Sequence, residues 1–204
     1  MNNYRMFAAS ALGIVLTLAS ITICRADTAA PPAPPMAAPP PSLLANGTPA
    51  PDFTVQDSSG NPVHLSDFKG KVVVIDFWAT WCGPCQASLP HTNAVAKQFK
   101  DQNVVILGVN TADTKQNFES WLPKHKDYDS IDFVIDSGPR GKNISNTLYK
   151  VYGIPTQYVV DRSGNISASF VGYGGPTPDL ENAIKAALAP ITPVTPVIPA
   201  QPTT

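Results

Sequence analysis

Asp76-Phe77-Trp78-Ala79-Thr80-Trp81-Cys82-Gly83-Pro84-Cys85 is the stretch that decides the fold. It overlaps the end of a nearly continuous apolar run over residues 72–77, which is typical of a strand buried on both faces. After it, apolar residues recur at helical spacing and predict a helix over residues 83–100, with a kink at Pro90. Two cysteines three residues apart therefore stand where a strand becomes a helix.

The spacing of Cys82 and Cys85 suits a redox pair. Residues three apart at the start of a helix lie on one face, close enough for a disulfide. Cys82 is predicted at the N-terminal end, where unpaired amides and the helix dipole favour its thiolate. Cys85, one turn further on, is expected to be shielded and to act as the resolving thiol. Pro84 costs no hydrogen bond because it falls in the first helical turn.

Two other readings of the cysteine pair compete with redox chemistry. A zinc site needs further ligands at suitable spacing, but His64, His91 and His125 are isolated and there is no second cysteine pair. We therefore expect no metal and no cofactor. A purely structural disulfide is also possible, although one that closes so short a loop restrains the unfolded chain little. The pattern favours the redox interpretation.

The rest of the chain around this segment alternates strands and helices. Turn formers separate apolar runs at 53–55 and 62–65, and again at 158–160 and 166–171, so two hairpins are predicted. Further strands are predicted at 104–109 and 131–135, and a final amphipathic helix at 180–188. Asp113 and Gln116 suggest the N-terminal capping box of another helix, and a short helix is predicted at 145–151. Such alternation predicts an α/β domain whose sheet is covered by helices on both faces.

Residues 1–26 are predicted to be an export signal. Arg5 precedes an uncharged apolar stretch at 7–23, and Cys24-Arg25-Ala26 supplies small residues for cleavage before Asp27. The apolar stretch also reaches the lower length limit of a membrane span, so an uncleaved anchor is an alternative. A lipid on Cys24 is a third.

Proline separates the domain, predicted at 52–189, from both ends. Residues 28–51 and 190–204 hold 14 of the 22 prolines. We therefore predict a Pro/Ala-rich linker at 27–51 and a Pro/Thr-rich disordered tail at 190–204. The whole chain has 14 Lys and Arg against 15 Asp and Glu, a balance that argues against a nucleic-acid partner. Cleavage of the signal would leave Cys82 and Cys85 as the only cysteines.

Residues 76–85 resemble the active-site segment of the thioredoxin superfamily. The chain over roughly 47–189 resembles the exported TlpA/ResA branch of thiol–disulfide oxidoreductases, which carries an AhpC/TSA-redoxin type domain. This resemblance implies a thioredoxin-like α/β fold: a central mixed sheet with helices on both faces and an N-terminal β-hairpin extension. Four further motifs carry it: Ala50-Pro51-Asp52-Phe53-Thr54, Leu65-Ser66-Asp67-Phe68-Lys69-Gly70-Lys71, Gly108-Val109-Asn110 and Tyr152-Gly153-Ile154-Pro155-Thr156.

The resemblance also implies roles for individual residues. Pro155 would be a cis-proline facing the disulfide, beside backbone that pairs with an extended substrate segment. The substrate-binding residues would be Trp81, Gly83, Pro84, Ile154 and Pro155. Two positions depart from the exported branch: many members have Glu where this chain has Ser88, and Asn where it has Asp76. An acid at Asp76 resembles thioredoxin itself, where it helps to deprotonate the resolving thiol, and an idle charge there would be costly to bury.

The resemblance implies an exported enzyme that reduces protein disulfides in the periplasm or another extracytoplasmic compartment. Cys82 would attack the substrate, Cys85 would resolve the mixed disulfide, and Asp76 would take the proton from Cys85. Electrons would come from a membrane thiol donor. Apocytochrome c, in cytochrome c maturation, is the best-known substrate class of the branch. We expect a monomer.

Three alternatives have different chemistry. A peroxiredoxin-like peroxidase needs a Pro-x-x-x-Thr/Ser-x-x-Cys frame, which is absent because Ile75 and Ala79 precede Cys82 at those positions. A disulfide-donating oxidase would use the same two cysteines in the opposite direction. A non-catalytic interaction module on a proline-rich stalk would not need an intact cysteine pair.

Overall fold

The computed structural model describes residues 42–139 and 141–190. These residues form a mixed sheet of seven strands in the order β2-β1-β5-β4-β3-β6-β7. The strands are β1 (Thr54–Gln56), β2 (Pro62–His64), β3 (Val72–Trp78), β4 (Val104–Asn110), β5 (Asp132–Ile135), β6 (Thr156–Val160) and β7 (Ile166–Val171). The helices are α1 (Gly83–Phe99), α2 (Lys115–Trp121), α3 (Ile144–Thr147) and α4 (Asp179–Leu188), with 3-10 turns η1 (Leu65–Phe68) and η2 (Leu122–Lys124).

Strand β3 lies inside the sheet because its apolar side chains can be buried on both faces. All seven of its residues are buried. It pairs in parallel with β4 and antiparallel with β6. Helix α1 is the crossover between β3 and β4, so the carboxyl ends of these two strands meet at one edge of the sheet.

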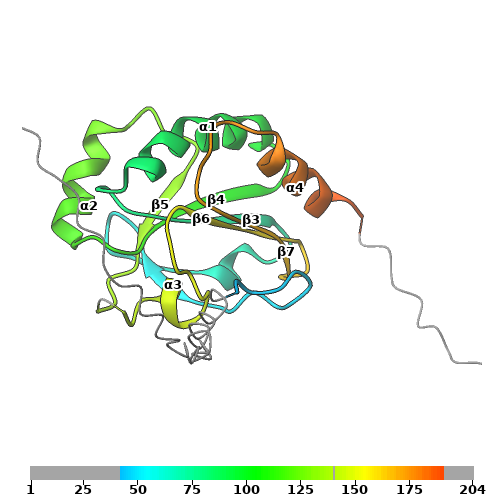
Figure 1. The fold of residues 1–204 in the computed structure, drawn as a ribbon, viewed down its shortest axis with the longest axis horizontal. Helices are drawn as coiled ribbons and strands as arrows, with labels where there is room; N and C mark the ends of the chain where they lie inside the picture. Colours follow the sequence, from blue (N-terminus) through cyan, green and yellow to red (C-terminus); the bar gives the residue numbers. More distant parts are fainter. Residues whose placement is uncertain (1–41, 140, 191–204) are drawn as a thin grey trace, which may run out of the picture. The chain divides into compact units, whose positions relative to one another are not determined.

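Helices cover both faces of the sheet, as predicted (Figure 1). Alternation along β3 sends Val74 and Trp78 into a core shared with α1, α2 and α4. Val73 and Phe77 point the other way, into a core that includes residues around α3. The predicted α/β class and mixed sheet are confirmed.

Both predicted hairpins are present. Strands β1 and β2 pair antiparallel, and β1 joins the main sheet through the Gln56–Ile135 pair with β5. Strands β6 and β7 form the second hairpin. Gly60 and Gly164 in the two turns have φ of +84° and +83°, a left-handed conformation that glycine adopts without steric cost.

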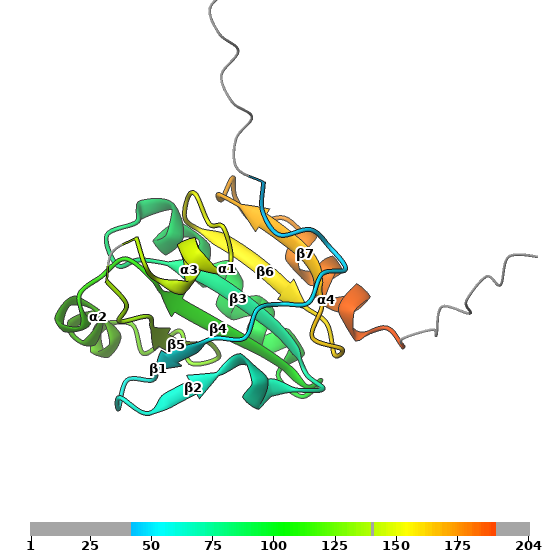
Figure 2. The same ribbon diagram turned by 90° about the horizontal axis from the view of Figure 1, so that it is seen from below.

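The segment that precedes β1 contacts the folded domain. The Gly47 amide donates to the Ile166 carbonyl at 2.7 Å. Leu43 and Leu44 pack against the core that contains Val73 and Phe77. Figure 2 shows this segment (blue) running past β7 and β6 before it reaches β1. The contacts of the domain therefore begin before residue 52, in part of the region that the sequence predicts as linker.

Two local predictions are wrong. Asp113 does not cap α2. The cap is Thr114, whose hydroxyl oxygen accepts from the Asn117 amide at 3.2 Å. The Asp113 carboxylate instead accepts from the Thr80 amide. The helix predicted at 145–151 is only the short α3. Pro90, where a kink is predicted, lies inside α1, and the helix extends on both sides of it.

The predicted signal or anchor at 1–26, most of the linker and almost all of the tail lie outside the described residues. Within 42–139 and 141–190, no helix combines the length and hydropathy that a membrane span requires.

Candidate active site

Cys82 and Cys85 form a disulfide at the N-terminus of α1, just beyond the end of β3. Their Cα atoms are 5.2 Å apart. Cys82 is the N-cap residue of α1, and the Cys85 amide donates to Cys82 Sγ at 3.2 Å. The sulfur thus takes the place of the oxygen that usually caps a helix, and it receives one of the otherwise unpaired amides.

The two sulfurs differ in access. Cys82 is 5% exposed, whereas Cys85 is fully buried. Gly83 and Pro84 between them are exposed. Solvent therefore reaches Cys82 and the first turn of α1 but not Cys85.

The loop before β6 lies against Cys82. The Ile154–Pro155 peptide bond is cis, as the resemblance implies. The Ile154 carbonyl oxygen is 3.7 Å from Cys82 Sγ. The Gly172 amide, after β7, donates to the Pro155 carbonyl at 2.8 Å and holds the loop in place. The backbone that precedes Pro155 is therefore next to Cys82 Sγ.

Large apolar side chains are exposed close to these elements. Trp81, directly before Cys82, is 63% exposed, and its Nε1 donates to the Ala112 carbonyl at 3.3 Å. Tyr152 and Val171 are the other exposed large hydrophobic residues in the described ranges. Tyr152 shortly precedes Pro155 in the chain, and Val171 directly precedes Gly172, which binds the Pro155 carbonyl. Trp78 is instead fully buried. The surface around Cys82 is thus partly apolar.

Asp113 holds the loop that leads from β3 to the disulfide. Its carboxylate accepts from the Thr80 amide at 2.6 Å, the Thr80 hydroxyl at 2.8 Å and the Asn110 side-chain amide at 2.6 Å. The adjacent carboxyl ends of β3 and β4 bring Asp113 to Thr80. The Gln86 side-chain amide donates to the Thr80 carbonyl from the other side, across the first turn of α1.

Asp76 is buried beneath α1. It is 1% exposed and lies between Val74 and Trp78 on the face of β3 that packs against this helix. Its Oδ2 accepts from Gln157 Nε2 at 3.0 Å, and its Oδ1 is buried without a hydrogen-bond partner among the described residues. Burial raises the pKa of Asp76 from 3.8 to about 6, and the hydrogen bond from Gln157 acts in the opposite direction.

Ser88 supplies no second carboxyl near the pair. It is buried, and its hydroxyl donates to the Cys85 carbonyl at 2.7 Å. Asp76 is therefore the acid available on this face of β3.

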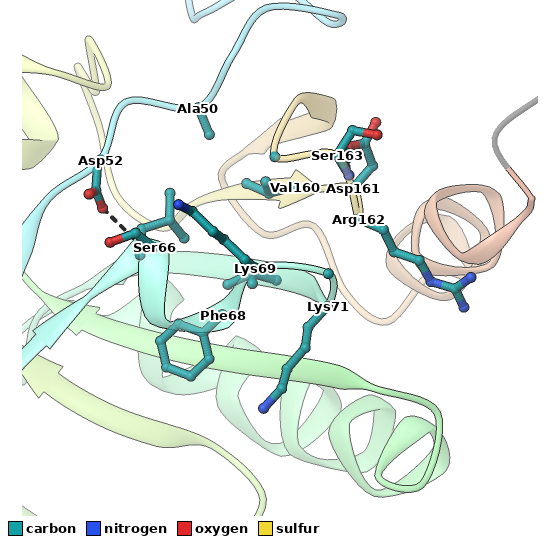
Figure 3. Close-up of a pocket in the computed structure, with 14 residues that line it drawn as sticks. Ala50, Asp52, Ser66, Phe68, Lys69, Lys71, Val160, Asp161, Arg162 and Ser163 are labelled. Carbon is teal, nitrogen blue, oxygen red and sulfur yellow. Dashed lines mark hydrogen bonds between the residues drawn. The ribbon is translucent and has the colours of Figure 1, made fainter. Parts of the chain in front are cut away.

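A separate cavity of about 520 Å³ lies at the opposite end of the strands (Figure 3). Val73 at the start of β3 and Val160 at the end of β6 line it, whereas the disulfide follows the end of β3. Lys69 reaches towards the Asp52–Ser66 pair, but the ends of Lys71 and Arg162 point away from that pair. The cationic groups do not meet at one point, so we assign no ligand to this cavity.

Sequence reasoning missed two residues of the site, Asp113 and Gln157. Asp113 was assigned to a helix cap because it stands three residues before Gln116. Gln157 is a polar residue inside an apolar strand, the same kind of signal that singled out Asp76. Both act on residues far away in the chain, so spacing alone does not reveal them.

Known proteins are similar to this chain in sequence and in fold. The AhpC/TSA family profile matches residues 46–169. The thiol-disulfide oxidoreductase ResA of Geobacillus kaustophilus (strain HTA426) is 34% identical over 131 residues, which are 64% of this chain and 72% of that protein.

Solved structures agree. A crystal structure from Chlorobium tepidum, described as thiol:disulfide interchange protein DsbE, has a TM-score of 0.61 and 34% identity, and it covers 72% of this chain and 99% of that one. The exposed lipoprotein thioredoxin of Streptococcus pneumoniae strain TIGR4 has a TM-score of 0.55 and 32% identity, over 68% and 98%. With its redox pair at the head of α1, this chain belongs to the AhpC/TSA family and is a thiol–disulfide oxidoreductase with a thioredoxin-like fold.

Proposed function

We propose that the protein is exported and reduces disulfide bonds in extracytoplasmic proteins. The observation that carries the disulfide-exchange part of this proposal is the unequal burial of the two cysteines, 5% exposed for Cys82 and none for Cys85. This difference supports Cys82 as the thiol that meets a protein substrate and Cys85 as the thiol that resolves the resulting bond.

In the reductive cycle, Cys82 Sγ attacks one sulfur of the substrate disulfide and releases the other as a thiolate. The α1 dipole and the Cys85 amide favour the Cys82 thiolate that this attack requires. Cys85 then gives its proton to Asp76 and attacks Cys82 Sγ, so the mixed disulfide breaks and the fully reduced substrate leaves. Oδ1 of Asp76, which has no other partner among the described residues, is the oxygen that would take this proton.

The substrate would bind over the first turn of α1 and the loop before β6. Gly83 and Pro84 offer exposed backbone close to Cys82, and Trp81 offers apolar area. An extended segment would pair with the backbone at Ile154, whose carbonyl oxygen lies 3.7 Å from Cys82 Sγ.

The N-terminal pattern at 1–26 supports export, either to the periplasm or to the outer surface. The pneumococcal relative is named an exposed lipoprotein. In such a compartment the disulfide would need a dedicated reductant, so a membrane thiol donor would supply the electrons. The protein would work as a monomer. Apocytochrome c, with its Cys-x-x-Cys haem-attachment site, is a substrate of the right chemistry.

Trapping of the mixed disulfide tests this proposal. Reduced Cys85→Ser should hold a disulfide-bonded Cys-x-x-Cys-His peptide as a covalent adduct on Cys82, visible by mass spectrometry. The matched variant Cys82→Ser should form no adduct, because Cys85 is buried. Equal trapping by both variants would refute the assigned roles.

A further inference from the structure

Asp76 needs support for the role proposed above. Proton transfer from Cys85 requires one carboxylate oxygen to be free and the other to be held, so that the group keeps its orientation. Asp76 is almost completely buried, so the group that holds it must lie beside it within the fold. A polar group that holds one oxygen of Asp76 meets these requirements.

Gln157 is that group. It faces Asp76 directly across the β3–β6 ladder. Both side-chain contacts come from its Nε2, which donates to Asp76 Oδ2 at 3.0 Å and to Thr92 Oγ1 of α1 at 3.2 Å. The two amide hydrogens are thus both used, and the carboxylate is fixed from one side.

Gln157 also borders a cavity of about 410 Å³ between α1, β7 and α4. It is only partly buried, in contrast to Asp76. The titratable groups that face this cavity come from three elements: His91 from α1, Tyr173 from the loop after β7 and Asp179 from α4. Glu181 of α4 lies 3.8 Å from His91 and completes the charged surroundings. The Gln157 side chain therefore stands between the buried carboxyl and this cavity.

We propose that Gln157 is a positioning residue for the resolving step: it holds Oδ2 of the Asp76 carboxylate, orients the group and leaves Oδ1 free for the Cys85 proton. This inference rests on the proton-acceptor role proposed for Asp76. In this step the Cys85 S–H bond breaks, an O–H bond forms on Asp76, and the sulfur keeps the electron pair with which it attacks Cys82.

The test uses a chromogenic aromatic disulfide that releases one coloured thiolate on attack by Cys82 and a second when Cys85 resolves the adduct. Gln157→Met keeps the length of the side chain but loses its donors. Without the hydrogen bond, Asp76 ionises at higher pH, so the pH profile of the second phase should move up by about one unit. This shift alone should slow the second phase about fivefold at pH 6, and the loss of orientation should leave a smaller reduction at pH 8. The first phase should not change, and neither should the profile of the control Gln102→Met, at an exposed position after α1.

Carboxyl and side-chain amide NMR provide a readout that needs no variant. In the unmodified protein, the Gln157 amide signals should titrate with the same midpoint as the Asp76 carboxyl. A Gln157 signal that ignores this titration, or a wild-type pH profile in Gln157→Met, would overturn the inference. Asp76→Asn separates the two proposals: if it slows the second phase while Gln157→Met does not, Asp76 keeps its role and Gln157 loses its own. If Asp76→Asn leaves the second phase unchanged, the role of Asp76 itself is wrong.

Discussion

The Asp113 carboxylate accepts hydrogen bonds from both the backbone amide and the hydroxyl of Thr80, at 2.6 and 2.8 Å. This contact joins the loop after β4 to the loop that leads from β3 to the disulfide. It positions the chain two residues before Cys82 without touching the sulfur. The reactive end of the sheet is thus held by a residue 33 positions away in the sequence.

Asp113→Ala should destabilise the oxidised protein by about 2 kcal/mol, because hydrogen bonds to a charged group contribute about 1.5–3 kcal/mol and the Thr80 amide loses its acceptor. Urea unfolding monitored by Trp fluorescence measures the loss. Asp101→Ala, at an exposed position after α1, is the control and should stay within about 0.5 kcal/mol of the unmodified protein. Equal stability of both variants would show that the Asp113–Thr80 contact does not stabilise the fold.

Asp76→Asn should stabilise the protein in a pH-dependent way. The pKa of Asp76 is raised from 3.8 to about 6 in the fold, so the native state binds more protons than the unfolded state between these values. The contribution of the neutral Asp76 carboxylic acid to the free energy of unfolding is fully present below about pH 3.8. It is lost as pH rises through about 6. We compare the free energy of unfolding of Asp76→Asn with that of the unmodified protein. At about 1.4 kcal/mol per pKa unit, this difference should favour the variant by about 3 kcal/mol more at pH 8 than at pH 3.5.

Denaturant unfolding of both proteins across this pH range measures that gain, and the comparison between pH values cancels any constant cost of the substitution. A difference that does not change with pH would mean that Asp76 is not neutralised by burial. The same variant should also slow the resolving step, so stability and catalysis should change in opposite directions.

Trp81→Ala should weaken protein substrates selectively. The exposed indole beside Cys82 offers apolar contact area, and loss of such an aromatic anchor costs about 1–2 kcal/mol, or roughly tenfold in kcat/KM. A small aromatic disulfide, which does not span this surface, should react at an unchanged rate. Trp81→Phe should recover most of the loss. An equal fall for large and small disulfides would instead place the effect on Cys82 itself.

Peroxide should not be a substrate. The positions seven and three residues before Cys82 are Ile75 and Ala79, and both are completely buried apolar residues. They offer no hydroxyl to activate a peroxide. Consumption of hydrogen peroxide by the reduced protein should therefore not exceed the background of its free thiols, and sustained turnover with a thiol donor would contradict this prediction.

The central strands and the redox pair were predictable because their signals are local. The apolar run at 72–77 and the cysteine spacing at 82–85 each specify their own structure, and β3 and α1 are where they were predicted. The contacts of Asp113 and Gln157 depend on which strands become neighbours, and no local pattern encodes that. The segment at 42–51 is predicted as linker for a similar reason, although the family resemblance reaches back to about residue 47: it joins the fold through backbone bonds and a few apolar contacts without any regular period.

The reduction potential of the Cys82–Cys85 pair tests the central claim, that this oxidoreductase works as a reductant. Equilibration of the purified protein with dithiothreitol buffers, followed by Trp fluorescence, gives the value. The account predicts a potential near that of thioredoxin, about −270 mV. A value near about −120 mV, as for the oxidant DsbA, would contradict it and make the protein a donor of disulfides.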